Sequence, residues 1–389
     1  MALDFPATPS TGQTFTGPNG VIWQYDGAKW VAGTAAGAYA PVQSPAFSGN
    51  PTAPTPPAGD ADTSLATTAF VAASTAGALA NVGRNLIHNS MFNLSQRGAG
   101  GWSTGNSYTA DRWLLNFNAG NDSSTITRNA AVDATRTAIG DEDVGYILSN
   151  VFTGSAITAG FCQFVQRIEG VRRLAGKTIT VSFWAAAAAT VKIGVNFLRI
   201  YGTGGTPTGG DWAFATGSSV TLSTAWARYS MTFVMPSVAG KMLGTNGDDY
   251  TALTFWFSAS TQNNAVAGNI GVQSGNVSIW GVQLEVGSTA TPLEKLDPMT
   301  QLQQCQRFYQ TGYANLAGYL NVGNSASTIY AFPVPMRGSV NFTSTFSQQV
   351  NCSGSGVTAY GTTHYQVYTN GSGLGGYACS GTFTASADL

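Results

Sequence analysis

Acid–base chemistry is the first question for this sequence, because its ionisable side chains are few. Asp, Glu, Lys and Arg make up 9% of the 389 residues, and only His88 and His364 carry an imidazole. A glycosidase needs two carboxylates facing each other across a cleft, and no catalytic motif surrounds any acid here. Ser-His-Asp, HExxH and P-loop signatures are missing. We therefore expect a protein that is not an enzyme, with His88 as a satisfied packing residue in an opening strand.

Metal and thiol chemistry have little support. The oxygen-rich stretches DED (141–143) and NGDD (246–249) lack the regular ligand spacing of an EF-hand. We expect solvated turns and no cofactor, and a structural Ca²⁺ ion remains an alternative. The four cysteines form no CxxC pattern, so free buried thiols are expected, and only Cys352 and Cys379 lie in one segment where they could pair.

Aromatic side chains beside small polar residues offer a better chemistry, which is binding. Residues 310–389 contain seven tyrosines among Ser, Thr, Asn and Gly, with Arg337 and Asp388 as the only charges. Tyrosine presents a flat apolar face with a hydroxyl, which suits the CH faces and hydroxyl rims of sugars. Two tryptophans in Gly-rich, loop-like segments add to this set. The candidate ligand-binding residues are Trp102, Trp212, Tyr360, Tyr365 and Tyr368; the alternative for the tyrosines is that they fill strands at contacts between copies of the chain.

Short aromatic and β-branched stretches must position these residues. Residues 178–186, 190–198, 227–235, 253–259 and 277–287 are separated by Gly, Asn, Ser and Thr turns. This pattern predicts an antiparallel β-sandwich over 85–296. Asp297-Pro298 is a strong helix start, so a connector helix over 297–309 is expected. A small distal β domain then covers 310–389, with Glu285 and Glu294 as structural residues of the closing segment of the sandwich.

The first 40 residues contain a predicted β-hairpin. Trp23 and Tyr25 alternate with polar residues, Asp26-Gly27 supplies a type I′ turn, and Trp30 lies on the return strand. This register places Tyr25 opposite Ala28 and Trp23 opposite Trp30. A lone hairpin is marginal in water, so the tryptophans must pack against copies in an oligomer, a socket on a partner, or an internal clamp.

A proline-rich spacer (41–61) and a short helix (62–84) follow. Six prolines between Pro41 and Pro57 favour an extended path. With Thr63 as N-cap, small and apolar residues then recur at spacings of 4 and 3. So little apolar area would hardly hold a lone helix, which indicates self-association, although a linker helix docked on its own domain is the alternative. The proposed seam is formed by Leu65, Ala69, Ala72, Ala76 and Leu79.

Charge and hydropathy restrict the partners. The formal net charge is −1 and no basic stripe exists, so we expect no nucleic-acid partner. No run approaches the roughly 18 apolar residues of a membrane span, and the N-terminus has no signal-peptide pattern. We expect synthesis in a cytosol and no membrane insertion.

Several motifs resemble those of tailed-bacteriophage fibres. The segment AFSGNPTAPTPPAGDADTSLATTAFVAA (46–73) resembles a recurring segment of tail fibres, and YDGAKW resembles small modules at their virion-proximal ends. NLIHNSMFNLSQRG (85–98), YTADRWLL (108–115), GKTITVSFWA and WGVQLEVGSTATPLE (280–294) together look like a jelly-roll, carbohydrate-binding-module-like domain of such proteins. QCQRFY (304–309) and AFPVPMRGSV (331–340) resemble stretches that follow this domain.

The resemblance implies a homotrimeric tail fibre. It would attach to a tail, baseplate or collar protein of the virion through residues 1–40, with Trp23, Tyr25 and Trp30 in the attachment hairpin. Its helical neck would be trimeric, and the phage would adhere to host-surface polysaccharide. The protein would assemble in the host cytoplasm and reside in the virion tail. The alternative is a structural collar, head or decoration fibre that binds other virion proteins without touching a receptor.

Overall fold

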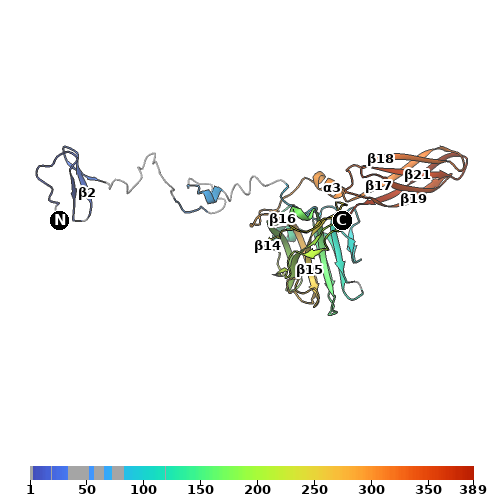
Figure 1. Cartoon of the computed structure of the whole chain (residues 1–389), viewed down its shortest axis with the longest axis horizontal. Coiled ribbons are helices and arrows are strands. Elements are labelled where there is room, and N and C mark those ends of the chain that lie inside the picture. Colours follow the sequence, from blue (N-terminus) through green and yellow to red (C-terminus); the bar gives the residue numbers. More distant parts are fainter. Residues whose placement is uncertain (1–2, 19, 34–51, 57–64, 72–82, 119) are drawn as a thin grey trace. The chain divides into compact units, whose positions relative to one another are not determined.

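The computed structural model describes residues 3–18, 20–33, 52–56, 65–71, 83–118 and 120–389 (Figure 1). The chain divides into two compact units, Met1–Ala78 and Leu79–Leu389, and each is described by itself. Apart from four short helical segments, regular structure in the described residues is β-strand, and the strand pairs are antiparallel. The expected all-β class is confirmed. No helix among these residues is long and apolar enough to cross a membrane.

The N-terminal module is a three-stranded sheet, β1 (Thr14–Thr16), β2 (Ile22–Tyr25) and β3 (Trp30–Gly33). The predicted hairpin exists, but the predicted register was wrong. Tyr25 pairs with Trp30, and Trp23 pairs with Ala32. The Asp26 carboxylate accepts hydrogen bonds from the backbone N–H groups of Ala28 and Lys29. This moves the centre of the turn by one residue, to Gly27 and Ala28.

The aromatic side chains of this module pack on one another. Phe5 stacks on Trp30 with ring centroids 5.1 Å apart and meets Trp23 edge-on at 5.4 Å, while Phe15 lies 6.1 Å from Trp30. Of the three packing partners considered for the tryptophans, the structure therefore shows the internal one, in which they pack within their own module. Phe5, about ten residues before the first strand, was not expected to take part.

The spacer and neck lie mostly outside the described residues. Residues 68–71 are helical, whereas 65–67 are not. The Thr67 hydroxyl accepts a hydrogen bond from the Phe70 N–H at 3.1 Å, so Thr67 and not Thr63 is the N-cap. Leu65 precedes this helix and is exposed, and Ala69 lies within it. Ala72, Ala76 and Leu79 of the proposed seam lie outside the described residues.

The second unit opens with a sandwich of two sheets. The six-stranded sheet has the order β14-β10-β16-β8-β7-β4, and the seven-stranded sheet has the order β12-β11-β15-β9-β6-β5 with β13 paired to β11. The strands are β4 (Gly100–Trp102), β5 (Ser107–Tyr108), β6 (Trp113–Phe117), β7 (Ser123–Ala130), β8 (Tyr146–Thr153), β9 (Phe161–Glu169), β10 (Thr178–Ala187), β11 (Val191–Ile200), β12 (Asp211–Trp212), β13 (Ser218–Leu222), β14 (Ala227–Val234), β15 (Tyr250–Ala259) and β16 (Ser274–Val286).

From β8 onward the long strands alternate between the two sheets, which is the jelly-roll pattern, and the short strands β12 and β13 are added beside β11. β8, β10, β14 and β16 belong to the six-stranded sheet, and β9, β11 and β15 to the other. Short helices, α2 (Asp133–Ile139) and η1 (Val171–Arg173), lie in the connections. The inner faces enclose one core, in which Trp113 stacks on Phe164 with ring centroids 4.6 Å apart. The predicted jelly-roll sandwich is thus confirmed.

The two ends of the sandwich sequence hold each other. The Asn85 side chain donates to the Val282 carbonyl and accepts from the Leu284 N–H. The Glu294 carboxylate accepts from the backbone N–H groups of Gly83 and of Asn85, the latter at 2.6 Å. Glu285 accepts from Thr291 and Gln283. The structural role expected for both glutamates is confirmed.

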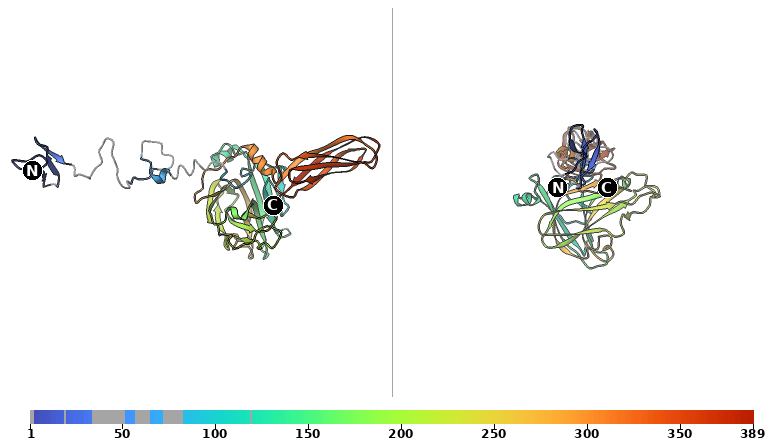
Figure 2. Two further views of the ribbon diagram at one scale, coloured as in Figure 1. Left: turned by 45° about the horizontal axis from the view of Figure 1, so that its top comes forward. Right: turned by 90° about the vertical axis from the view of Figure 1, so that its left-hand side faces the viewer.

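Helix α3 (Pro298–Gln306) leads to the distal head, as predicted. Asp297 caps it by accepting from the Met299 and Thr300 N–H groups, and Pro298 occupies the first turn. The head consists of β17 (Tyr309–Leu320), β18 (Ser325–Ala331), β19 (Asn341–Val350), β20 (Cys352–Tyr360), β21 (His364–Gly371) and β22 (Gly375–Ser386). These form two three-stranded sheets, β17-β22-β19 and β18-β21-β20. Figure 2 shows these strands, coloured orange to red, lying side by side along their length.

The head has its own small core between these sheets, including Leu316, Val367 and Phe383. All four cysteines of the chain are buried free thiols. Cys352 and Cys379 both belong to the head core but form no disulfide, which agrees with the expectation of free thiols.

Breaking the contact between the two ends of the sandwich sequence should destabilise the second unit. In Glu294→Gln, one charged oxygen that accepts a backbone N–H is lost, at a cost of about 1–3 kcal/mol. We expect a lower urea midpoint with tryptophan fluorescence as the probe. Glu142→Gln is the control, since Glu142 is exposed. Equal midpoints for both variants would contradict the proposed role of Glu294.

Candidate functional site

The outer face of the seven-stranded sheet carries the candidate site. Successive side chains of a strand point to opposite faces. In β15, Leu253, Phe255 and Phe257 enter the core between the sheets, so Thr254 and Trp256 face outward. Trp256 is nevertheless only 1% exposed, because Phe161, Trp212 and the loop around Ala267 pack against it.

Strand pairing sets the outward side chains in rows. Trp212 of β12 lies opposite Leu198 of β11, and Leu198 lies opposite Ala252 of β15, which pairs with Arg167 of β9. In a second row, Trp256 lies opposite Gln163, and Gln163 opposite Asn116. The first row thus runs from an aromatic ring to a guanidinium, and the second from an indole to amides.

These rows form a groove of about 250 Å³. Trp212 packs against Trp256 with ring centroids 5.2 Å apart, and Phe161 meets Trp256 edge-on at 6.3 Å. The Nε1–H of Trp256 is buried without a hydrogen-bond partner among the described residues. The full lining is Leu114, Asn116, Phe161, Gln163, Val165, Arg167, Leu198, Trp212, Tyr250, Ala252, Thr254, Trp256 and Asn263.

Amide side chains give the groove its polarity and fix its walls. The Asn116 amide donates to the Gln163 carbonyl oxygen at 3.2 Å. Asn196, one row away on β11, donates to the backbone carbonyls of Phe214 and Val266 at 2.9 and 2.8 Å, which fastens both neighbouring loops to the sheet. The position of Trp212 is therefore defined from its own strand and from the loop that follows it.

Asp211, the neighbour of Trp212 in β12, helps to hold this tryptophan in position. Its carboxylate accepts two hydrogen bonds from the Arg199 guanidinium, at 2.8 and 3.0 Å, and a third from Lys241 Nζ at 3.0 Å. Burial raises the pKa of this carboxyl, but the hydrogen bonds from Arg199 and Lys241 outweigh it and hold the pKa below its usual value. The strand β12 has only two residues, so this ion pair adds to the few backbone contacts that hold it in place.

Chemically, the groove can bind but has no acid–base pair of its own. Among its described lining residues there is no Asp, Glu or His. Half-buried aromatic rings beside amides and one guanidinium fit a ligand with apolar CH faces and several hydroxyls.

The structure places Trp212 in this groove and Trp102 elsewhere. Trp102 lies in β4, the edge strand of the opposite sheet, pairs with Ile126 and packs half-buried against the main core. The expectation of an exposed loop was wrong for Trp102, because the glycines before it form a β-bulge and not a loop.

The three candidate tyrosines of the head lie on two different faces. Tyr360 and Tyr368 are 59% and 39% exposed on the outer face of the sheet β18-β21-β20, with Gln366 and His364 on the same face. Tyr365 alternates with Tyr368 and enters the head core, with its ring centroid 4.8 Å from that of Phe383. Tyr365 was therefore wrongly placed among surface residues. Its strand spacing from Tyr368 is odd, which indicates opposite faces.

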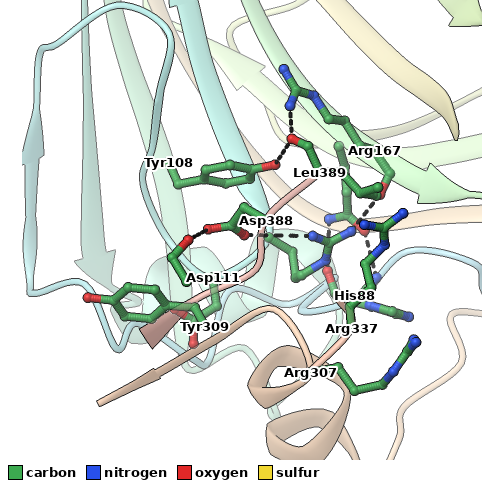
Figure 3. Close-up of polar contacts among 12 residues, drawn as sticks. His88, Tyr108, Asp111, Arg167, Arg307, Tyr309, Arg337, Asp388 and Leu389 are labelled. Atoms are coloured by element: carbon green, nitrogen blue, oxygen red, sulfur yellow. Dashed lines mark hydrogen bonds and ion pairs between the residues drawn. The ribbon is translucent and has the colours of Figure 1, made fainter. Parts of the chain in front are cut away.

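A second polar cluster joins the sandwich to the head (Figure 3). Asp388 pairs with Arg97, and Arg112 Nη1 lies 3.9 Å from its other oxygen. Glu169 accepts from Arg307 at 2.6 Å and from Arg337 at 2.9 Å. Tyr108 and Arg167 both donate to the Leu389 carbonyl oxygen.

His88 belongs to this cluster and departs from expectation in two ways. It lies in a turn at 88–91 and not in a strand, because the Gln166 side chain bonds both its N–H and its carbonyl, at 2.7 and 2.9 Å. The residue is half-buried, and its buried Nδ1 has no hydrogen-bond partner among the described residues. Burial, followed by the charge of Arg112, lowers the pKa of His88 to about 3.

The two oxygen-rich loops are engaged by the chain itself. Lys295 Nζ lies 2.7 Å from Asp141 and 3.4 Å from Asp143. Asp248 accepts from Thr203, and Asp249 from the Val171 N–H at 2.7 Å. No group of three or more His, Cys, Asp or Glu arranged to hold a metal occurs in the described part of the chain.

Sequence reasoning missed most of the groove. Trp256 and Tyr250 lie in or beside the predicted strand 253–259, where period-two alternation would place Trp256 on the face opposite Phe255. Gln163 and Asn116 had no comparable signal, because a single amide in a strand is common and only cross-strand pairing brings these two together.

The chain matches no protein-family model and no curated protein by sequence. Among solved structures it is similar to a carbohydrate-binding module of the type CBM4, with 17% identity, 52% of this chain and 99% of that one covered, and a TM-score of 0.30. It is also similar to the enzymatically active domain of tailspike protein 4 from bacteriophage CBA120, with 14% identity, 52% and 21% covered, and a TM-score of 0.30.

A third similar structure is the family 11 carbohydrate-binding module from Clostridium thermocellum in complex with a β-1,3-1,4-mixed-linked tetrasaccharide. It has 12% identity, with 50% of this chain and 99% of that one covered, and a TM-score of 0.28. Likenesses at this level say nothing about the ligand of this chain. The fold and the groove rest on the strand pairing and contacts described above.

Loss of the Asp211 charge should release Trp212. A carboxylate whose pKa is lowered stabilises the fold fully above its unfolded value and loses this contribution as the pH falls through its folded pKa. We therefore expect the Trp212 signal in ¹⁹F NMR of 5-fluorotryptophan-labelled protein to stay constant at neutral pH and to move only below pH 3.8. In Asp211→Asn, the signal should already be shifted at pH 7.

Trp212→Phe assigns the signal, and Asp133→Asn is the matched control, because Asp133 has a fully exposed side chain. An unchanged Trp212 signal in Asp211→Asn at pH 7 would show that the ion pair does not position the ring.

Proposed function

We propose that this protein binds glycan through the groove on the outer face of the seven-stranded sheet. The observation that carries the proposal is the groove in which Trp212 packs on Trp256, and Trp256 lies opposite Gln163, which is hydrogen-bonded to Asn116. Tyr250 and Arg167 line the same groove. Aromatic faces and amides in one groove suit a polyhydroxylated ligand, and the absence of acids among its described lining residues supports binding without catalysis.

We further propose that the chain is a homotrimeric bacteriophage tail fibre that adheres to host-surface polysaccharide. Support comes from the resemblance of residues 46–73 and of the sandwich motifs to phage fibres. Three copies would present three grooves, and simultaneous binding would raise the effective affinity of weak single sites. Because Trp23 and Trp30 pack internally, attachment to a virion protein through residues 1–40 would use the outside of the module, not its tryptophan core.

The head supplies a second candidate surface, on which Tyr360 and Tyr368 share an uncharged outer face with Gln366. The groove is the stronger candidate, because its aromatic rings are held by defined partners and flank a concave space. The two surfaces are tested separately.

Truncating Trp212 should weaken glycan binding. In Trp212→Ala, we expect loss of host-cell binding by at least about tenfold, which corresponds to about 1.4 kcal/mol. Binding is measured by flow cytometry with fluorescent full-length protein, before and after periodate oxidation of surface sugars. Wild-type binding should be lost after periodate.

Tyr360→Ala is the comparison variant for the head and should bind as wild type does. Loss of binding in Tyr360→Ala but not in Trp212→Ala would move the site to the head. Absence of binding by the wild type would favour the collar or decoration fibre, which contacts other virion proteins.

A further inference from the structure

A small cavity lies beside helix α3 and shares only Arg167 with the lining of the glycan groove. Its volume is about 120 Å³, roughly ten times what one water molecule needs. Leu86, His88, Gln166 and Arg167 form part of its wall, and the helix contributes Gln304, Arg307 and Phe308. Figure 3 shows His88, Arg307 and Arg337 beside this helix.

The lining is strongly cationic. Four arginines, Arg112, Arg167, Arg173 and Arg307, face one acid, Glu169, among its lining residues. Glu169 already accepts from Arg307 and Arg337. Arg173 is exposed, and its side chain makes no hydrogen bond or ion pair within the described part of the chain. With Arg173 at the rim of the cavity and the other arginines in its wall, the lining therefore has an excess of positive charge.

Buried donors in this cavity are unpaired. Arg112 is 2% exposed, and its Nη2 donates to the Arg167 carbonyl at 2.6 Å, but its Nε and Nη1 have no hydrogen-bond partner among the described residues. The Phe308 ring covers its guanidinium, 3.3 Å from the ring centroid. Nη1 faces Asp388 at 3.9 Å, which is too far for a hydrogen bond. His88 Nδ1 is also buried without a partner. Leaving such groups unsatisfied is costly.

We propose that this cavity binds a compact tetrahedral oxyanion, phosphate or sulfate, either free or as the end group of a glycan. The guanidinium groups of Arg112 and Arg173 match the geometry of such an anion, Arg307 adds positive charge although its fork binds Glu169, and the neutral His88 ring can donate from Nδ1. Gln166 fixes the backbone of His88, so the ring is held in place before the anion arrives. The inference does not depend on the glycan groove.

The two histidines make the test specific. Full-length protein with ¹³C-labelled histidine rings is titrated with sodium phosphate, then with sodium sulfate, at constant ionic strength and pH 7. The His88 ring signal should shift with a saturable curve. His364, which is exposed in the head, should stay unchanged and serves as the internal control. Sodium chloride controls for charge screening, and glucose 6-phosphate distinguishes a sugar-borne phosphate from the free ion.

Adjacent arginines provide matched variants. Arg173→Ala should weaken phosphate binding by roughly tenfold or more, because one charge-assisted donor is lost. Arg172→Ala removes the same charge one residue away and outside the cavity, and it should bind as wild type does. Both side chains are exposed, so neither change should unfold the protein. A His88 signal that ignores both anions, or equal loss in both variants, would overturn the proposal.

Discussion

Burial of β15 on both faces is the constraint on which the rest of the structure depends. Its inward side chains, Phe255 among them, fill the core between the sheets, and its outward Trp256 is covered by Phe161 and Trp212. If β15 were buried on one face only, the outer face of the seven-stranded sheet would be flat and exposed to solvent. Because β15 needs cover on its second face, the neighbouring loops rise above the sheet, and the groove is the space that they leave.

A second constraint acts where the sandwich meets the head, and it is electrostatic. Ion pairs join the sandwich to the head, because Arg97 and Arg112 meet Asp388, and Glu169 meets Arg307 and Arg337. Buried ion pairs are costly unless all partners are present. The joint is therefore specific in its geometry, although several of its buried polar atoms, those of Arg112 and His88 among them, have no hydrogen-bond partner among the described residues.

Expectations from sequence were right where local pattern decides structure. Alternating apolar residues predicted the strands of the sandwich, and Asp297-Pro298 predicted the start of helix α3. They failed where one residue of register matters. The turn at Asp26 lies one position later than predicted, so Trp23 pairs with Ala32 and not with Trp30. The N-cap is Thr67, whereas Thr63 was predicted. Tyr365 turned inward for the same reason, since each step along a strand changes the face.

The sequence by itself determined the all-β class, the jelly-roll sandwich, the connector helix and one groove residue, Trp212. Composition and period-two patterns are local properties, so they can be read without knowing which strands are neighbours. Only the tertiary structure decided that Trp256, Gln163 and Asn116 share a face with Trp212, and that Trp102 does not. It also brought His88 next to Arg112 and Arg307. These sets come from strands and a helix far apart in the chain, and long-range pairing alone sets their register.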